Sequence, residues 1–188
     1  MEKCKLNESI TSKRLVLKKR EHAHDDDMWE AISQNRKFLR EYLFWVDGTQ
    51  SFADVVKATD YFAELWENDG EWAYDIYSIE DNRLLGSVGA HNINFQNQKA
   101  EIGYWLRRSE TGKGYMKEAV LALEAELFNA GFHRLEIHCD VNNLPSQGVA
   151  KRCGYELESV AKESLYHYTG LHDRHVYVKF SPYPITGF

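Results

Sequence analysis

The sequence EIGYWLRRSETGKGYMKEAVLALEAELF, residues 101–128, predicts a strand, a glycine-containing loop and a long helix in direct succession. The strand is indicated by Ile102 and the apolar run 104–106, which charged residues bound on both sides. Apolar residues then recur at the i, i+3, i+4, i+7 spacing of one buried helical face: Met116, Ala119, Val120, Leu123 and Leu127. We expect the opposite, charged face to lie in solvent: Lys117, Glu118, Glu124 and Glu126.

The loop between this strand and this helix, residues 111–115, contains two glycines, which let a chain turn sharply and approach a ligand closely. The first N–H groups of a helix have no intrahelical acceptor, and the helix dipole adds positive charge there. The pattern therefore favours a site for phosphate or pyrophosphate, although a bare G-x-G also occurs in ligand-free turns. Its spacing excludes the G-x-x-x-x-G-K-[ST] and G-x-G-x-x-G loops of nucleotide-binding folds.

The run E-I-G-Y-W-L, the charged loop and G-K-G-Y-M-x-E-A resemble the acetyl-CoA-binding core of the GNAT acetyltransferases, especially the RimL-type N-acetyltransferases. The family loop Q/R-x-x-G-x-G/A falls on residues 111–116, where Gly114 fits. Thr111 and Met116 depart from the commonest residues, but neither removes a backbone N–H donor. The similarity runs from Arg14 to about Lys179 and includes Leu39-Arg40-x-x-Leu43-x-Trp45, Asn143-x-x-Ser146 and Gly154-Tyr155.

This resemblance implies an α+β GNAT fold, with a central, mostly antiparallel mixed sheet of about seven strands flanked by helices. The length suits a single domain over residues 1–188. The sequence patterns agree with this fold. Alternation predicts strands at 14–17, 72–79, 84–93 and 135–139, and a final hairpin through 157–160 and 175–180. Helical spacing predicts one helix or two short ones at 28–43, and helices at 52–66 and 143–153. Residues 1–13 are polar, and we expect them to be loosely held.

Composition narrows the class of partner. A net charge of −6 argues against nucleic acid and mildly favours an amine acceptor. The three cysteines show no C-x-x-C spacing, and no signal-peptide pattern or 18-residue apolar run is present, so we expect a reduced, cytoplasmic protein without a membrane partner. Cys139 and Cys153 fall within apolar patterns and are expected in the core. The protein is expected to act as a monomer or homodimer.

Acetyl-CoA is the co-substrate that the resemblance implies. Residues expected to bind it are Trp105, Leu106, Arg107, Thr111, Gly112, Lys113, Gly114, Tyr115, Met116, Asn143 and Ser146. Ser146 matches the family's N-x-x-S serine, which hydrogen-bonds the sulfur of CoA and hands it a proton. An ordinary helix start, with Asn143 as N-cap and Ser146 bonded to the local backbone, is the alternative.

The group that deprotonates the amine is left open by the sequence. Glu101 begins the central strand, where GNAT enzymes often place a carboxylate, and His91 and His138 are alternatives from neighbouring strands. RimL-type enzymes carry a glutamate about eight residues before the H-D of the last hairpin, a position that Leu165 occupies here. A free α-amine has a pKa of about 7.7 to 8.0, so an α-amino acceptor needs little help from a base.

The acceptor is expected to be a primary amine, of a protein N-terminus or of an aminoacyl small molecule. Trp45 and Phe52 flank the Asp47-Gly48 turn and are candidate platforms for a flat or apolar acceptor group, with His91 nearby; core packing is the alternative. The self-immunity acetyltransferase domain for the aminoacyl-nucleotide antibiotic microcin C is similar to RimL, so antibiotic detoxification is the second candidate. Polyamines and aminoglycosides are further options.

Two readings outside this enzyme class also exist. A non-catalytic acetyl-CoA sensor would be expected to lack Ser146 or the glycine loop, and both are present. A zinc module built on His167, His172, Asp173 and His175 lacks the cysteine support typical of such sites. The run His22–Asp27 also combines histidine with aspartate, but acidic residues favour a helix start there. We therefore expect no metal.

Overall fold

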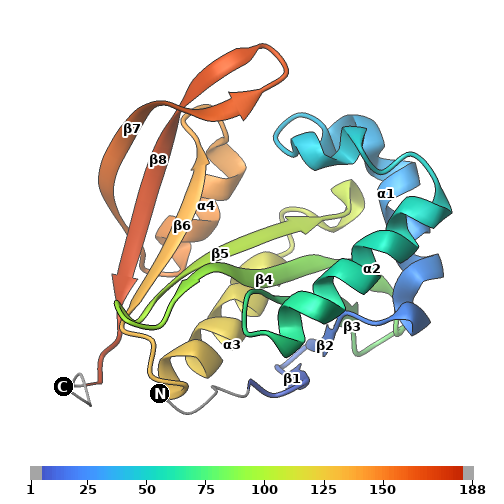
Figure 1. Cartoon of the computed structure of the whole chain (residues 1–188), viewed down its shortest axis with the longest axis horizontal. Helices are drawn as coiled ribbons and strands as arrows, with labels where there is room; N and C mark the ends of the chain where they lie inside the picture. Colours follow the sequence, from blue (N-terminus) through green and yellow to red (C-terminus); the bar gives the residue numbers. More distant parts are fainter. Residues whose placement is uncertain (1–5, 184–188) are drawn as a thin grey trace.

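One sheet of eight strands forms the centre of the computed structural model, which describes residues 6–183. In chain order the strands are β1 (Ser9–Thr11), β2 (Leu15–Lys19), β3 (Trp72–Ser78), β4 (Leu84–Asn94), β5 (Lys99–Leu106), β6 (Arg134–Asp140), β7 (Glu156–His167) and β8 (Gly170–Phe180). Their spatial order is β1-β2-β3-β4-β5-β6-β8-β7, and every neighbouring pair is antiparallel except β5 and β6. The predicted mixed, mostly antiparallel sheet is confirmed (Figure 1).

The strand count differs from the expectation of about seven because residues 9–11 form the short edge strand β1. Ile10 of β1 pairs with Leu17 of β2, and Leu6 just before it is buried. The expectation that residues 1–13 are loosely held is therefore wrong for this segment; residues 1–5 lie outside the described range. Strand β1 was missed because it has only three residues, two of them polar, which is too short for an alternating pattern to be recognised.

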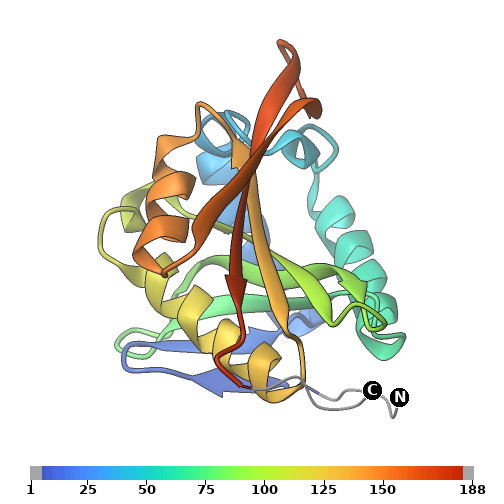
Figure 2. The ribbon, with the colours of Figure 1, turned by 90° about the vertical axis from the view of Figure 1, so that its left-hand side faces the viewer.

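In the described range, α-helices cover both faces of the sheet: α1 (Asp25–Leu39), α2 (Phe52–Glu67), α3 (Tyr115–Asn129) and α4 (Leu144–Arg152). Helices α1 and α2 lie on one face, and α3 and α4 lie on the other (Figures 1 and 2). Helix α1 carries Asp25, Asp26 and Asp27 in its first turn, as predicted for a helix start. None of these helices is long and apolar enough to cross a membrane.

The main core lies between the sheet and α3, whose predicted apolar face is buried. Glu124, which we expected in solvent, is only 7% exposed. Its carboxylate accepts a hydrogen bond from Nζ of Lys179 on β8 at 2.6 Å. The expectation was wrong because β8 brings a lysine to this face of the helix, which helical periodicity does not reveal. Cys139 and Cys153 are buried as predicted.

Strands β5 and β6 pair over only three positions, from Lys99↔Arg134 to Glu101↔Glu136. Beyond Glu101, β5 stays paired with β4 as far as Leu106, while β6 stays paired with β8 as far as Asp140. The two strands therefore part, and the edges that face each other lose their ladder hydrogen bonds. Helix α3 follows the end of β5 and α4 follows the end of β6, so both helices start at the open end of this parting.

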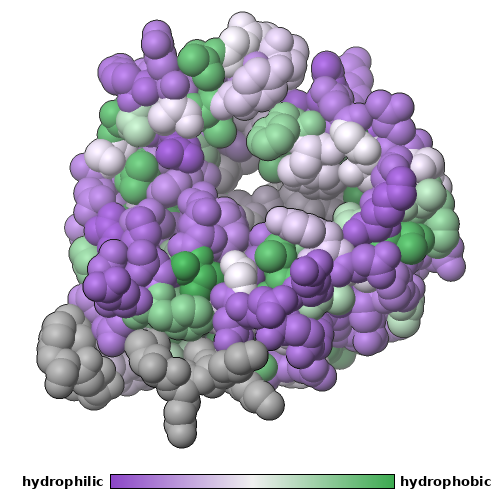
Figure 3. Space-filling view, in the orientation of Figure 1, coloured by the Kyte–Doolittle hydropathy of each residue, from purple (hydrophilic) through white to green (hydrophobic). Residues whose placement is uncertain are grey.

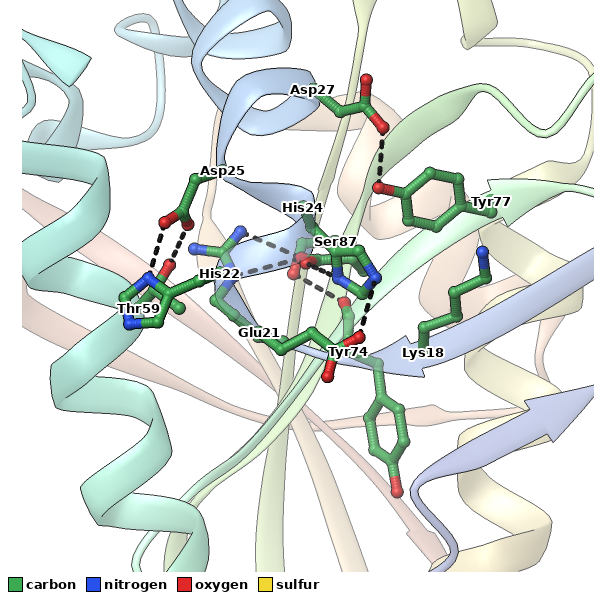
Figure 4. A network of polar contacts seen from close by, with 12 residues as sticks. Lys18, Glu21, His22, His24, Asp25, Asp27, Thr59, Tyr74, Tyr77 and Ser87 are labelled. Carbon is green, nitrogen blue, oxygen red and sulfur yellow. Dashed lines mark hydrogen bonds and ion pairs between the residues drawn. The ribbon is translucent and has the colours of Figure 1, made fainter.

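A buried polar network ties the start of α1 to the sheet (Figure 4). Asp75 on β3 is 0% exposed and accepts hydrogen bonds from Nε and Nη2 of Arg20 at 3.1 and 2.9 Å. Its other oxygen lies 3.0 Å from Nδ1 of His24, the residue that precedes α1. Nearby, Tyr77 donates to Asp27 at 2.9 Å. The network fixes α1 over β3 and β4.

Replacing Asp75 by asparagine is expected to lower the free energy of unfolding by about 3 kcal/mol, because the buried Arg20 guanidinium loses its counter-charge. Urea denaturation measures this change. The matched control is Asp69→Asn, in a turn where φ is 53°, which asparagine tolerates; its change should stay within about 0.5 kcal/mol. A loss for Asp75→Asn no larger than the control's would show that the network does not anchor α1.

Candidate functional site

The loop before α3 presents a row of free backbone donors. Gly112 and Gly114 have φ of 78° and 82°, a left-handed conformation that glycine adopts without strain. Within residues 6–183, none of the backbone N–H groups of residues 112–117 has a protein acceptor. These donors, with the positive end of the α3 dipole behind them, fit a phosphate or pyrophosphate group. We call residues 112–117 the donor loop.

Charged side chains hold the donor loop from both sides. The carboxylate of Glu118 on α3 accepts from the backbone N and from Nε of Arg14, at 2.6 and 2.7 Å. Arg14 in turn donates to the carbonyl oxygen of Lys113 at 3.1 Å. On the other side, Nζ of Lys113 lies 3.0 Å from the buried carboxylate of Glu110. The loop is thus fixed by contacts that leave its N–H groups available.

Ser146 lies in the first turn of α4, at the open end of the parting between β5 and β6. Its backbone N–H donates to Oδ1 of Asn143 at 3.1 Å, so Asn143 is the N-cap of the helix. Its hydroxyl lies 3.1 Å from the hydroxyl of Tyr104 on β5. Sequence analysis did not identify Tyr104 as a site residue, because it alternates with Ile102 and Leu106 like a core position. The hydroxyl pair spans the parted strands.

An ionisable cluster lies where β5 and β6 stop pairing. Oε1 of Glu101 is 3.3 Å from Nε2 of His91 on β4, and Oε2 is 3.0 Å from Nδ1 of His138 on β6. Asn92 also donates to Oε2 of Glu101, at 2.9 Å. Nε2 of His138 lies 2.8 Å from Oε2 of Glu136. The predicted base and its two predicted alternatives therefore form one connected group, the Glu101 cluster.

Ion pairs outweigh burial in setting the charges of the Glu101 cluster. Burial raises the pKa of Glu101, but contacts with His138 and His91 lower it by more, to well below its usual range. Burial lowers the pKa of His138, but Glu101 and Glu136 together raise it to about 9. At neutral pH Glu101 is an anion and His138 a cation. Glu101 is therefore an ionised carboxylate and a weak proton acceptor, with its charge balanced in part by His138.

Gly103 has a packing role beside this cluster. A Cβ at position 103 would lie 2.8 Å from Cε1 of His91, closer than real Cβ contacts come. The absence of a side chain lets the imidazole ring lie directly on β5. The glycine of the E-I-G-Y-W-L run is therefore needed for the packing of His91 against β5.

Two predicted cofactor-binding side chains lie away from the donor loop. Because side chains alternate along a strand, Trp105 and Arg107 share the face of β5 that α1 covers. The Trp105 ring packs against Trp45, with centroids 6.1 Å apart. Nη2 of Arg107 is 3.5 Å from Glu30 of α1, and its backbone N–H already donates to Leu85. The structure does not bring these side chains to the donor loop.

The other predicted site residues are divided between core and surface. Leu106 and Met116 are buried in the main core. The Oγ1 hydroxyl of Thr111 donates a hydrogen bond to the carbonyl oxygen of Arg108 in the same turn, at 2.8 Å. Phe52 is 41% exposed at the start of α2 and takes no part in the cluster that contains Trp45. The two predicted platforms are therefore separate: Trp45 packs against Trp105, and Phe52 does not belong to that cluster.

The tip of the β7–β8 hairpin contacts the segment that links α1 and α2. Nε2 of His167 lies 2.9 Å from the carbonyl oxygen of Glu41, and the Arg40 guanidinium lies 4.8 Å from the ring centroid of Tyr168. Figure 3 shows an opening in the surface below this bridge. Leu165, at the family position of a glutamate, pairs with His172 in the same hairpin and supplies no carboxylate.

The zinc reading has no geometric support. His167 and His172 stack with ring centroids 4.3 Å apart, whereas Asp173 binds Nζ of Lys162 at 2.6 Å. Across residues 6–183, no group of three or more histidine, cysteine, aspartate or glutamate side chains is arranged to hold a metal ion. These histidines instead stabilise the hairpin tip.

Comparison with known proteins extends over most of the chain. The acetyltransferase (GNAT) domain family matches residues 14–156. The putative ribosomal N-acetyltransferase YdaF of Bacillus subtilis (strain 168) is 33% identical over 178 residues, 93% of this chain and 92% of YdaF. The ribosomal-protein-serine acetyltransferase of Escherichia coli (strain K12) is 30% identical over 142 residues, 75% of this chain and 78% of that protein.

Solved structures agree with these relatives. The RimL ribosomal L7/L12 alpha-N-protein acetyltransferase in complex with coenzyme A matches with a TM-score of 0.88 at 27% identity, over 92% of this chain and 98% of that chain. The microcin C7 self-immunity acetyltransferase MccE, in complex with acetyl-CoA and AMP, matches with a TM-score of 0.86 at 25% identity, over 90% and 93%. The chain therefore belongs to the GNAT family of acetyltransferases and is an N-acetyltransferase of the RimL type.

Proposed function

We propose that the protein transfers the acetyl group of acetyl-CoA to the α-amine at the N-terminus of a protein, with a ribosomal protein as the first candidate. The names of the relatives YdaF and the ribosomal-protein-serine acetyltransferase support this acceptor. One observation carries the proposal: the parting of β5 and β6 has the donor loop and Ser146 at its open end and the Glu101 cluster at its closed end.

The donor loop is the part of the chain suited to the pyrophosphate of acetyl-CoA. Its N–H groups need an anionic acceptor, and its glycines let the backbone come close. The unpaired edge of β5 after Glu101 offers further backbone groups to the pantetheine arm. When bound there, acetyl-CoA supplies a thioester carbonyl that is activated for attack by an amine.

Ser146 is the candidate proton donor to the leaving sulfur. Its hydroxyl is oriented by Tyr104 at 3.1 Å, and burial raises the pKa of Tyr104, so this phenol stays protonated at neutral pH. The one proton of the Tyr104 hydroxyl can be donated to Ser146 Oγ at 3.1 Å or to the Ser146 carbonyl oxygen at 3.3 Å, and the first arrangement leaves the serine proton free to point toward the parting. Tyr104 is thus a positioning residue for Ser146.

The Glu101 cluster acts on the amine side of the reaction. The Glu101 carboxylate attracts the incoming α-ammonium group, which carries one positive charge. A free α-amine loses its proton at a pKa of about 7.7 to 8.0, so water suffices to accept that proton near neutral pH. The neutral amine nitrogen then bonds to the carbonyl carbon, the C–S bond breaks, and Ser146 gives its hydroxyl proton to the sulfur. The proton that the attacking nitrogen loses passes through water and restores the Ser146 hydroxyl. Glu101 therefore serves to place the amine.

An aminoacyl-nucleotide is the second candidate acceptor, as in antibiotic self-immunity. It is favoured by the similarity to MccE and by the paired rings of Trp45 and Trp105 on the face of β5 that carries Glu101. A base stacked on such a ring gains about 1 to 3 kcal/mol.

Competition between the two acceptors tests the proposal. Incubation with acetyl-CoA, a serine-terminal ribosomal-protein peptide and a non-hydrolysable aminoacyl-adenylate should add about 42 Da to the peptide, as mass spectrometry measures. Ser146→Ala should lower kcat by about 100-fold and leave the Kd for acetyl-CoA nearly unchanged, whereas Ser164→Ala in the exposed hairpin should change neither. Acetylation of the nucleotide alone would favour the second candidate, and acetylation of neither would contradict both.

The charge state of the Glu101 cluster gives a pH-dependent prediction. His138 should titrate near pH 9 in an NMR titration of its imidazole, and Glu101→Gln should lower that pKa because one of two carboxylates is lost. The pKa of His138 is about 9 in the folded state and about 6.5 in the unfolded state. Protonated His138 therefore stabilises the fold fully below about pH 6.5, and this stabilisation is lost as the pH rises through about 9. The free energy of unfolding should therefore fall over this range, and fall less in Glu101→Gln.

Glu158→Gln is the matched control for that titration. Glu158 contacts Arg134 and not His138, so its loss should leave the His138 pKa unchanged. Titration of His138 near 6.5 in the unmodified protein would contradict the charge assignment.

A further inference from the structure

An open groove lies between α1 and the segment that follows β5. Its volume is about 630 Å³, and its lining includes Glu30, Gln34 and Asn35 of α1 together with Arg83, Arg107 and Arg108. Of the three arginines, Arg83 is paired with the buried Glu110 at 2.6 Å and Arg107 lies 3.5 Å from Glu30, so the excess positive charge of the lining rests on Arg108. The groove contains none of the residues of the donor loop or of the Glu101 cluster.

Arg107 is the most unusual of these residues. Its side chain is buried, at 5% exposure, yet its Nε has no hydrogen-bond partner in the described part of the chain. Its remaining contacts are long: 3.4 Å to Oε1 of Gln34, 3.4 Å to the carbonyl oxygen of Asp27 and 3.5 Å to Glu30. Ordinary N–H···O hydrogen bonds measure about 2.7 to 3.2 Å. A buried guanidinium with five N–H donors thus has one nitrogen, Nε, without a partner and only long contacts for the others.

The walls of the groove are held in place without any ligand. Oδ1 of Asn35 accepts from the backbone N–H of Arg108 at 2.9 Å, and its Nδ2 donates to Ala31 at 2.8 Å. Nη2 of Arg83 donates to the buried Glu110 at 2.6 Å. Because these contacts fix α1 against the segment 107–109, a ligand would meet a preformed site at little ordering cost.

The groove lies on the acceptor side of the sheet. Arg107 directly follows β5 and continues the alternation of Glu101, Gly103 and Trp105, since alternate residues of an extended chain point the same way. It stands six positions beyond Glu101, about 20 Å at 3.3 Å per residue. An extended peptide advances by a similar amount per residue. A side chain about five residues from the reacting amine therefore spans this distance.

We propose that the groove is a carboxylate-binding subsite for the acceptor, in which Arg107 and Arg108 bind an acidic side chain near the sixth residue of the acceptor peptide. The planar guanidinium matches the two oxygens of a carboxylate, and such charge-assisted pairs are stronger than neutral hydrogen bonds. Glu30 already contacts Nη2 of Arg107 at 3.5 Å, so the incoming carboxylate binds through the unpartnered Nε of Arg107 and through Arg108. This inference rests on the proposed function, which supplies a peptide with a free N-terminal amine.

Two peptide amides test the subsite, Ser-Ala-Ala-Ala-Ala-Glu-Ala and Ser-Ala-Ala-Ala-Ala-Gln-Ala. Calorimetric titration uses the full chain saturated with coenzyme A, which occupies the donor loop and prevents turnover. The glutamate peptide should bind about 10-fold more tightly than the glutamine peptide. In the double variant Arg107→Lys, Arg108→Gln this preference should fall below about twofold. Thermal unfolding and acetyl-CoA affinity verify that the variant is folded, and Arg108→Gln alone, at an exposed position, should lower the preference partly.

Arg152→Gln, an exposed arginine of α4 on the other face of the sheet, is the matched control and should keep the full preference. Equal binding of both peptides, or a preference that survives in the double variant, would overturn the subsite. The result also separates the two proposals. Equal acetylation of both peptides keeps the proposed function and rejects the subsite, while arginine-dependent binding without acetylation keeps the subsite and rejects the acceptor.

Discussion

The short parallel pairing of β5 and β6 is the constraint on which the rest of the structure depends. Three paired positions hold the strands together up to Glu101, after which β4 alone holds β5 and β8 alone holds β6. Unpaired backbone groups on two facing strand edges cost free energy, so such edges pair with each other unless other contacts hold the strands apart. Here each strand is secured by its antiparallel neighbour, so the parting persists without a ligand. In the proposed function, this parting is the place where the thioester and the amine meet.

Charge is distributed along the parting in a way that separates the two substrates. The donor loop presents N–H groups and a helix dipole, which suit phosphate. The Glu101 cluster presents a carboxylate with a strongly lowered pKa, which suits an ammonium group. His138, held as a cation by Glu101 and Glu136, keeps that carboxylate ionised. The subsite that we propose at Arg107 would bind an acidic side chain, so an acceptor with an amine and a downstream acid would match both sites.

Sequence patterns predicted what depends on local periodicity and spacing. The central strand, the glycine loop, the α3 helix and the Asn143 cap all follow from residues close together in the chain, and the structure has them. Other features depend on contacts between distant segments. Tyr104 became a partner of Ser146 only because α4 folds back against β5, and Glu124 is buried only because Lys179 reaches it. Arg107 was expected at the cofactor, but strand alternation turns its side chain toward α1. Pattern alone does not give these pairings.

Amide hydrogen exchange in the presence and absence of acetyl-CoA tests most directly whether the donor loop holds the co-substrate. Acetyl-CoA should protect the backbone N–H groups of residues 112–117. Gly114→Ala should weaken binding about 10-fold, because a left-handed conformation costs other residues about 1 to 2 kcal/mol. Gly131→Ala imposes the same strain beyond the other end of α3, where φ is 93°, and should leave binding unchanged. Unchanged exchange at residues 112–117, or equal effects of the two substitutions, would contradict the account.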